Sequence, residues 1–215
     1  MFVKKLGALL LCISFLSAGC ASYKPNIASD ARMEQCNNCK QTQGGVTVGL
    51  VPYFNPARTM GVFDNDFKDH ELLALDLMMD CPDGKDYTCK KADITVSDSN
   101  GKTLKRVDGK EAGNMVGRGY GTSVVWFFVG GVVGLTISAV HTSSINTKIE
   151  NDLMRVELPE NVKVKGLSHG FVYFDMAPYK KTGPPKEMSA NVKLLDDATN
   201  QELAYSVKFD PNAGL

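Results

Sequence analysis

The sequence predicts a mainly β protein, an antiparallel, Ig-like β-sandwich interrupted by an apolar, glycine-rich helical hairpin and an amphipathic helix. Three observations predict this fold. Short segments within residues 46–107 and 171–209 alternate apolar and polar side chains, which is the period of strands with one buried face. Turn-forming sequences separate these segments, as in SDSNGK at 97–102 and DDATNQE at 196–202. A segment without charged residues, 119–140, divides the two groups.

The alternating segments define the expected strands of a single domain over residues 46–209. We expect strands at 46–51, 73–79, 92–96 and 103–107 in the first half, and at 171–174, 190–194 and 203–209 in the second. The sequence NPARTMG at 55–61 breaks the alternation after the first strand. The predicted core between the two sheets consists of Leu75, Leu77, Ile94, Val172, Val192, Leu194, Tyr205 and Val207. Residues 210–215 are expected to be a C-terminal tail.

The first 19 residues have the layout of a secretory signal peptide. Lys4 and Lys5 precede an apolar run from Leu6 to Leu16, and three small residues follow it. The sequence Ser17-Ala18-Gly19-Cys20 resembles the lipobox of bacterial lipoproteins. This resemblance implies that the Cys20 thiol is diacylated, that cleavage precedes it, and that the new amino terminus is acylated. The alternative is ordinary secretion with an incidental cysteine.

The resemblance also implies a cellular location for the mature chain. Position 21 is Ala rather than Asp, which is similar to the pattern that sorts bacterial lipoproteins to the outer membrane. We therefore expect a lipid-anchored protein that faces the periplasm, with membrane lipid as the partner of acylated Cys20. Residues 20–45 have almost no apolar periodicity, so they are expected to form the lipidated N-terminus and a flexible tether.

Four cysteines remain after Cys12 leaves with the signal and Cys20 takes the lipid. An even number of thiols in an exported chain predicts two disulfides. We favour Cys81–Cys89, because CPDGKDYTC places a tight turn between them, and this pairing leaves Cys36 for Cys39. The CNNC spacing of the second pair also fits a thiol–disulfide site, and a four-thiolate zinc site is a further alternative.

The apolar insertion at 117–141 is the second unusual feature of the chain. Gly130 and Gly131 are expected to turn the chain, giving two apolar arms of ~15 Å each if helical. Such a hairpin would contact a membrane, a second copy of the chain or another envelope protein. The expected contact residues are Val124, Val125, Trp126, Phe127, Phe128, Val132, Val133, Leu135 and Ile137. A helix buried in the domain and a single membrane span are the alternatives, although a span would separate the two β-halves.

An amphipathic helix is expected directly after the insertion, at residues 142–158. Ile145, Ile149, Leu153 and Val156 recur at three- and four-residue spacing among polar residues. Pro159 ends the pattern.

The residues that carry chemistry do not assemble into an enzyme signature. Lysine plus arginine and aspartate plus glutamate are equal at 24 each, so the chain has no basic footprint for nucleic acid. The acidic sequence FDNDFKDHE at 63–71 lacks the glycine and the distant glutamate of a calcium loop, and the three histidines have no metal spacing. We therefore expect no cofactor, no metal and no catalytic activity.

Two body segments, VPYFNPARTMGVFDNDFKDHELLALDLMM (51–79) and KGLSHGFVYFDM (165–176), resemble an uncharacterised group of envelope lipoproteins. In that group a hydrophobic, glycine-rich insertion separates two β-halves, which implies the Ig-like sandwich and the anchor but no reaction. The function expected is therefore a structural or protein-interaction role in the envelope. Alternatives are an accessory subunit of an envelope-spanning secretion assembly and a thiol–disulfide protein that uses Cys36 and Cys39.

Overall fold

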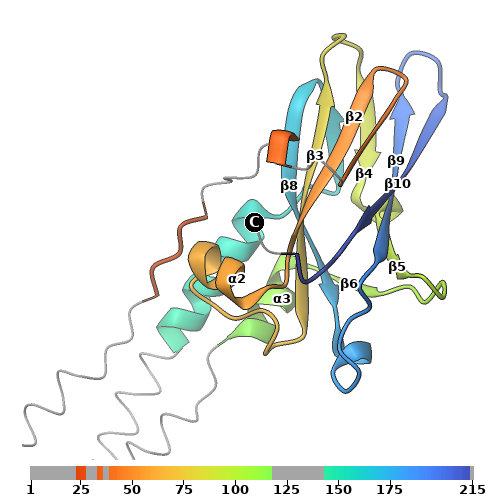
Figure 1. Cartoon of the computed structure of the whole chain (residues 1–215). Coiled ribbons are helices and arrows are strands. Elements are labelled where there is room, and N and C mark those ends of the chain that lie inside the picture. The colour runs from red at the N-terminus through yellow and green to blue at the C-terminus, as the bar shows by residue number, and fades with distance from the viewer. Residues whose placement is uncertain (1–22, 28–32, 36–38, 118–142, 214–215) are drawn as a thin grey trace, which may run out of the picture.

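Two antiparallel sheets packed face to face form the body of the molecule (Figure 1). The structure, a computed structural model, describes residues 23–27, 33–35, 39–117 and 143–213. The first sheet has the order β1 (Lys40–Gln43), β2 (Val46–Tyr53), β3 (Leu72–Cys81), β8 (Gly166–Asp175) and β6 (Lys105–Val107). The second has the order β10 (Glu202–Phe209), β9 (Met188–Asp196), β4 (Tyr87–Lys90) and β7 (Asn161–Val164), with β5 (Thr95–Asp98) also paired to β9.

Both sheets contain strands from each of the two β-halves. β8 pairs along its whole length with β3, from Leu72 opposite Asp175 to Cys81 opposite Gly166. In the second sheet β9 pairs with β4 and β5 of the first half. The two halves therefore fold as one sandwich on one side of any membrane. This arrangement contradicts the single-span alternative, because a span would place the paired strands on opposite sides.

The core between the sheets contains all eight residues predicted for it. Each of them is at most 2% exposed and belongs to the same buried cluster. Tyr205 also closes one end of the core, where its hydroxyl donates to the carbonyl oxygens of Gln43 and Val46 at 3.0 and 3.3 Å. Period-two alternation located these positions because each strand of a sandwich turns every second side chain inward.

A second apolar cluster covers the outer face of the first sheet, beneath α2 (Pro56–Phe63), α3 (Gly109–Val116) and a helix at 143–156. Tyr53, Phe63 and Phe171 meet edge to face in it, with ring centroids 5.3–5.6 Å apart. Strand β3 is therefore buried on both faces over most of its length, and β8 is buried from Gly170 to Phe174. Burial on both faces explains the nearly continuous apolar sequence LLALDLMM of β3.

Three local structures differ from the sequence expectation. NPARTMG ends the strand alternation as expected, but it also begins α2, a helix that was not predicted: Asn55 caps the helix by accepting from Ala57 N at 3.0 Å, and Pro56 occupies the first turn, where its missing N–H costs nothing. The segment from Lys91 to Asp93 is a 3-10 turn, so β5 starts only at Thr95. The sheet also begins at Lys40, six residues before the expected start of the domain.

Candidate functional site

The helix at 143–156 and α3 lie side by side on the outer face of the first sheet. The apolar residues predicted for an amphipathic helix point to this face, and Ile145, Ile149 and Leu153 are buried there. From α3, Ala112 and Val116 are buried in the same cluster. The structure thus confirms an amphipathic helix after the insertion.

Three glycines spaced four residues apart bring the two helices into close contact. The contacts are Gly109 with Met154, Gly113 with Glu150 and Gly117 with Asn146. A Cβ at Gly113 would lie 2.6 Å from the Cα of Glu150, so only glycine permits this approach. Each step of four residues along α3 matches a step of four residues back along the second helix. The helices are therefore antiparallel and held in a fixed register.

The N-terminal segment 23–27 is held on the same face of the sheet. The backbone N–H of Lys24 donates to Asp64 Oδ2 at 2.9 Å, and that of Asn26 donates to the carbonyl oxygen of Val62 at 2.8 Å. Tyr23 packs, partly buried, against the outer cluster. This part of the expected tether is consequently fixed to the domain.

Consecutive residues after α2 connect this segment to α3. Asp64, which ends α2 in the left-handed region at φ 50°, accepts from Lys24. Asn65, 8% exposed, donates from Nδ2 to the carbonyl oxygen of Val116 at 2.8 Å. The N-terminal segment and the last turn of α3 therefore bind adjacent residues of the same loop.

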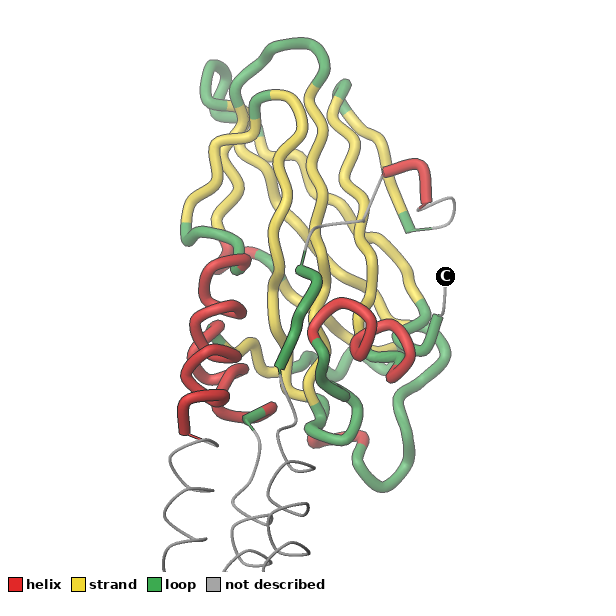
Figure 2. Tube along the Cα trace, turned by 90° about the vertical axis from the view of Figure 1, so that its left-hand side faces the viewer, coloured by secondary structure: helices red, strands yellow, loops and turns green. Residues whose placement is uncertain are grey.

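These contacts define one end of the sandwich, called here the exit end. It consists of Tyr23, Lys24, Asp64, Asn65, Val116, Gly117 and residues 143–146. Figure 1 and Figure 2, two views at right angles, place these segments at the same end of the molecule. The turns from β3 to β4 and from β9 to β10 lie at the opposite end. The apolar insertion thus leaves and rejoins the domain beside the first described residues of the N-terminal segment.

A buried ion pair fixes the other end of the helix pair to the 3-10 turn that follows β4. Lys91 Nζ lies 2.8 Å from Glu157 Oε1 and 2.6 Å from Glu160 Oε1. The other oxygen of Glu157 accepts from the backbone N–H of Gly109 at 2.9 Å. Burial by itself lowers the pKa of Lys91, but the hydrogen bonds to the two carboxylates outweigh burial and raise it. The helix pair is therefore held firmly at its base.

Polar groups also lie beneath the helix at 143–156. Asp76 on β3 is fully buried, with its Oδ1 3.6 Å from His169 Nδ1 on β8. Hydrogen bonding to Asp76 raises the pKa of His169, although partial burial opposes this. Tyr173 donates from its hydroxyl to the carbonyl oxygen of Leu153 at 2.9 Å, and burial raises its pKa well above the ordinary value. A neutral, buried phenol of this kind positions the helix on the sheet.

The predicted Cys81–Cys89 disulfide is absent, and this correction has a topological reason. Both thiols are free and buried. Cys81 ends β3 in the first sheet, whereas Cys89 lies in the second sheet, paired with Leu194. The Cys81 Sγ–H donates to the carbonyl oxygen of Lys85 at 3.3 Å, and burial raises the pKa of Cys89 to about 12.

The remaining predicted site residues lie mostly outside the described ranges. Cys20, Cys36 and all nine predicted contact residues between Val124 and Ile137 belong to this group. Cys39 is described, half-buried and free, where it precedes β1. Burial raises the pKa of its thiol, and the positive charge of Arg58 opposes the shift. A raised pKa reduces the thiolate fraction that redox exchange requires.

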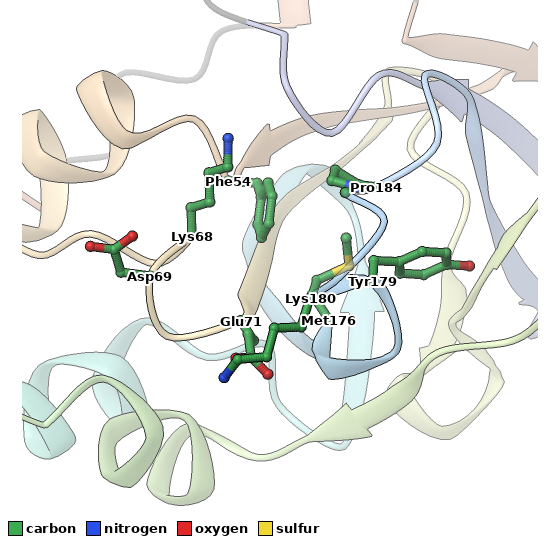
Figure 3. A pocket seen from close by; sticks show the side chains of 9 residues that line it. Phe54, Lys68, Asp69, Glu71, Met176, Tyr179, Lys180 and Pro184 are labelled. Atoms are coloured by element: carbon green, nitrogen blue, oxygen red, sulfur yellow. The ribbon is translucent and has the colours of Figure 1, made fainter.

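A cleft of about 300 Å³ lies beside the start of β3 (Figure 3). Phe54 and Met176 supply apolar parts of its wall. Lys180 forms an ion pair with Glu71 on its rim, so these two charges neutralise each other.

Within the described ranges, no group of three or more His, Cys, Asp or Glu side chains is placed to hold a metal ion. The helices in those same ranges also include none with the length and apolar character to cross a bilayer.

Sequence reasoning missed Asp64, Asn65 and the glycine contacts of α3. The first two lie in the acidic sequence FDNDFKDHE, where no local pattern indicates their distant partners. The signal for the glycines was present, because the four-residue spacing seen at Gly117 and Gly121 begins at Gly109.

Comparisons with protein-family models, with curated proteins and with solved structures found no match.

Proposed function

We propose that this chain is a lipid-anchored bacterial envelope protein of the outer membrane, facing the periplasm, with a structural or protein-interaction role and no catalytic activity. Acylated Cys20 is the anchor. The β-sandwich is the rigid body that the anchor holds at the membrane. The observation that carries the proposal is the exit end, where the N-terminal segment and both ends of the apolar insertion meet.

We further propose that the apolar insertion is a helical hairpin between α3 and the helix at 143–156. Its two ends lie close together, because Gly117 and Asn146 are in contact and the two helices are antiparallel. Gly117 itself is not helical, with ψ 139°, so the first arm of the hairpin would begin beyond it. The adjacent glycines Gly130 and Gly131 suit the turn between the two arms.

The hairpin would present an apolar surface that the sandwich does not need for its own core. Among the described residues, one buried apolar cluster lies between the sheets and a second lies beneath the helices. The apolar residues from Val124 to Ile137 are proposed as a contact surface for the membrane, for a second copy of the chain or for another envelope protein.

Metabolic labelling with a fatty acid tests the anchor. The wild-type chain is expected to incorporate label, and Cys20→Ser is expected to lose it. Cys12→Ser is the matched control, because Cys12 leaves with the signal peptide and should not affect labelling. Continued labelling of Cys20→Ser, or no labelling of the wild type, would refute the lipoprotein proposal.

A further inference from the structure

We infer that the exit end of the sandwich lies directly against the bilayer surface, so that the domain has a fixed orientation on the membrane. The inference rests on the proposed acylation of Cys20 and adds to it the surface that meets the lipid. The occupant of this surface is a phospholipid bilayer, the one in which the acyl chains of Cys20 are embedded.

The first step is the length of chain between the lipid and the fixed domain. Tyr23 is three residues from Cys20, so the chain between their Cα atoms spans at most ~11 Å. A flexible tether from residue 20 to residue 45 would instead have an end-to-end distance of ~28 Å and would leave the orientation free. The fixed part of the domain therefore begins within ~11 Å of the acylated cysteine.

The second step is that the chain is fixed as soon as it reaches the domain. Lys24 and Asn26 both donate backbone hydrogen bonds to the end of α2 and the loop that follows it, and Tyr23 packs on the outer cluster. The segment 23–27 therefore transmits the position of the anchor to the sandwich. Because residue 23 lies at the exit end, that end is the part of the domain nearest the lipid.

The third step concerns the opposite end. β3 runs for ten residues away from the loop after α2, a distance of ~33 Å, to the turns at 82–86 and 197–201. These turns would project into the periplasm, where they are accessible to other envelope components. The exit-end loop carries both signs of charge, with Lys24 and Lys68 near Asp64 and Asp66, so the bilayer contact should depend little on anionic lipid.

Energy transfer from the protein to the bilayer tests the orientation. Single cysteines replace Lys68, three residues beyond Asn65, or Ala198, in the turn between β9 and β10, and both positions are exposed. The background is Cys36→Ser with Cys39→Ser, since Cys81 and Cys89 are buried. Each full-length, acylated protein carries a donor dye and is incorporated into vesicles of phosphatidylethanolamine and phosphatidylglycerol with a short-range acceptor on the headgroups.

We expect transfer from the Lys68 position to exceed that from the Ala198 position by about threefold or more, because a ten-residue strand separates them. Equal transfer, or greater transfer from Ala198, would overturn the inference. The intact mass of each protein reports whether the acyl chains are present. A mass without the acyl chains would refute the proposed acylation of Cys20. The expected acylated mass together with equal transfer would refute the inferred orientation alone.

Discussion

Asn65 donates a 2.8 Å hydrogen bond from Nδ2 to the carbonyl oxygen of Val116, which joins the loop after α2 to the last turn of α3. The acceptor lies at a helix terminus, where carbonyl groups have no partner within the helix. This bond and the one from Lys24 to Asp64 are made by neighbouring residues, so a single loop organises the exit end.

Asn65→Ala should lower the free energy of unfolding by ~1–3 kcal/mol, because it leaves a buried carbonyl without its donor. Asn151→Ala is the matched control on the exposed face of the helix at 143–156, where no loss is expected. Urea denaturation of the two variants measures the difference. An equal effect in both would show that the Asn65 contact does not stabilise this end.

Gly113→Ala should destabilise the protein by ~1–3 kcal/mol, because the new methyl group would overlap the backbone of Glu150. Gly61→Ala is the control within α2, where a Cβ would meet nothing within 4 Å. Alanine there should stabilise the helix by up to ~1 kcal/mol. Thermal unfolding should therefore shift in opposite directions, and a shift in the same direction would contradict the close helix contact.

Leu77→Ala should cost ~2–5 kcal/mol, because Leu77 is 2% exposed in the core between the sheets. Leu167→Ala provides a comparison on β8, since Leu167 is 63% exposed. The exposed substitution should change the free energy of unfolding by less than ~0.5 kcal/mol. A cost below ~1 kcal/mol at Leu77 would place this strand at an edge rather than in the core.

The pair formed by His169 and Asp76 should make stability depend on pH. The folded-state pKa of His169 is raised above its unfolded value of about 6.5, so its contribution is fully present below that pH and is lost as pH rises through the folded pKa. The His169 side chain is 46% exposed, so solvent screening should limit the contribution to below ~1 kcal/mol. The difference in unfolding free energy between wild type and His169→Gln should therefore be larger near pH 5.5 than near pH 8.5. In an Asp76→Asn background this pH dependence should vanish, and its persistence would assign the effect to another group.

The pattern of side chains predicted the inner core because inward positions in a sandwich recur every second residue. The same rule could not reveal that β3 is buried on its other face, because Leu72, Ala74 and Met78 are covered by helices distant in sequence. It also missed β4 and β7, two strands of four residues each. The disulfide prediction failed for a related reason: a tight turn between Cys81 and Cys89 does not show that the chain passes from one sheet to the other.

The exit end was also beyond sequence reasoning, for a different physical reason. Its contacts join residues 40 and 51 positions apart, Lys24 with Asp64 and Asn65 with Val116, and neither pair has a local signature. The insertion itself was recognisable from its lack of charge. The proximity of its two ends became visible only through the glycine contacts of α3.

The central claim is that the apolar insertion is a contact surface separate from the core of the sandwich, and urea unfolding of Val133→Lys in detergent tests it most directly. A lysine that faces lipid costs ~2.5–3.5 kcal/mol on membrane insertion, so Val133→Lys should weaken contact with a membrane. The urea concentration at which the sandwich unfolds should nevertheless equal that of the wild type, because Val133 is proposed to lie outside the core. Val192→Lys is the matched control, since Val192 is fully buried between the sheets and should not tolerate the charge. If Val133→Lys destabilises the sandwich as severely as Val192→Lys, the insertion is part of the core and the claim is wrong.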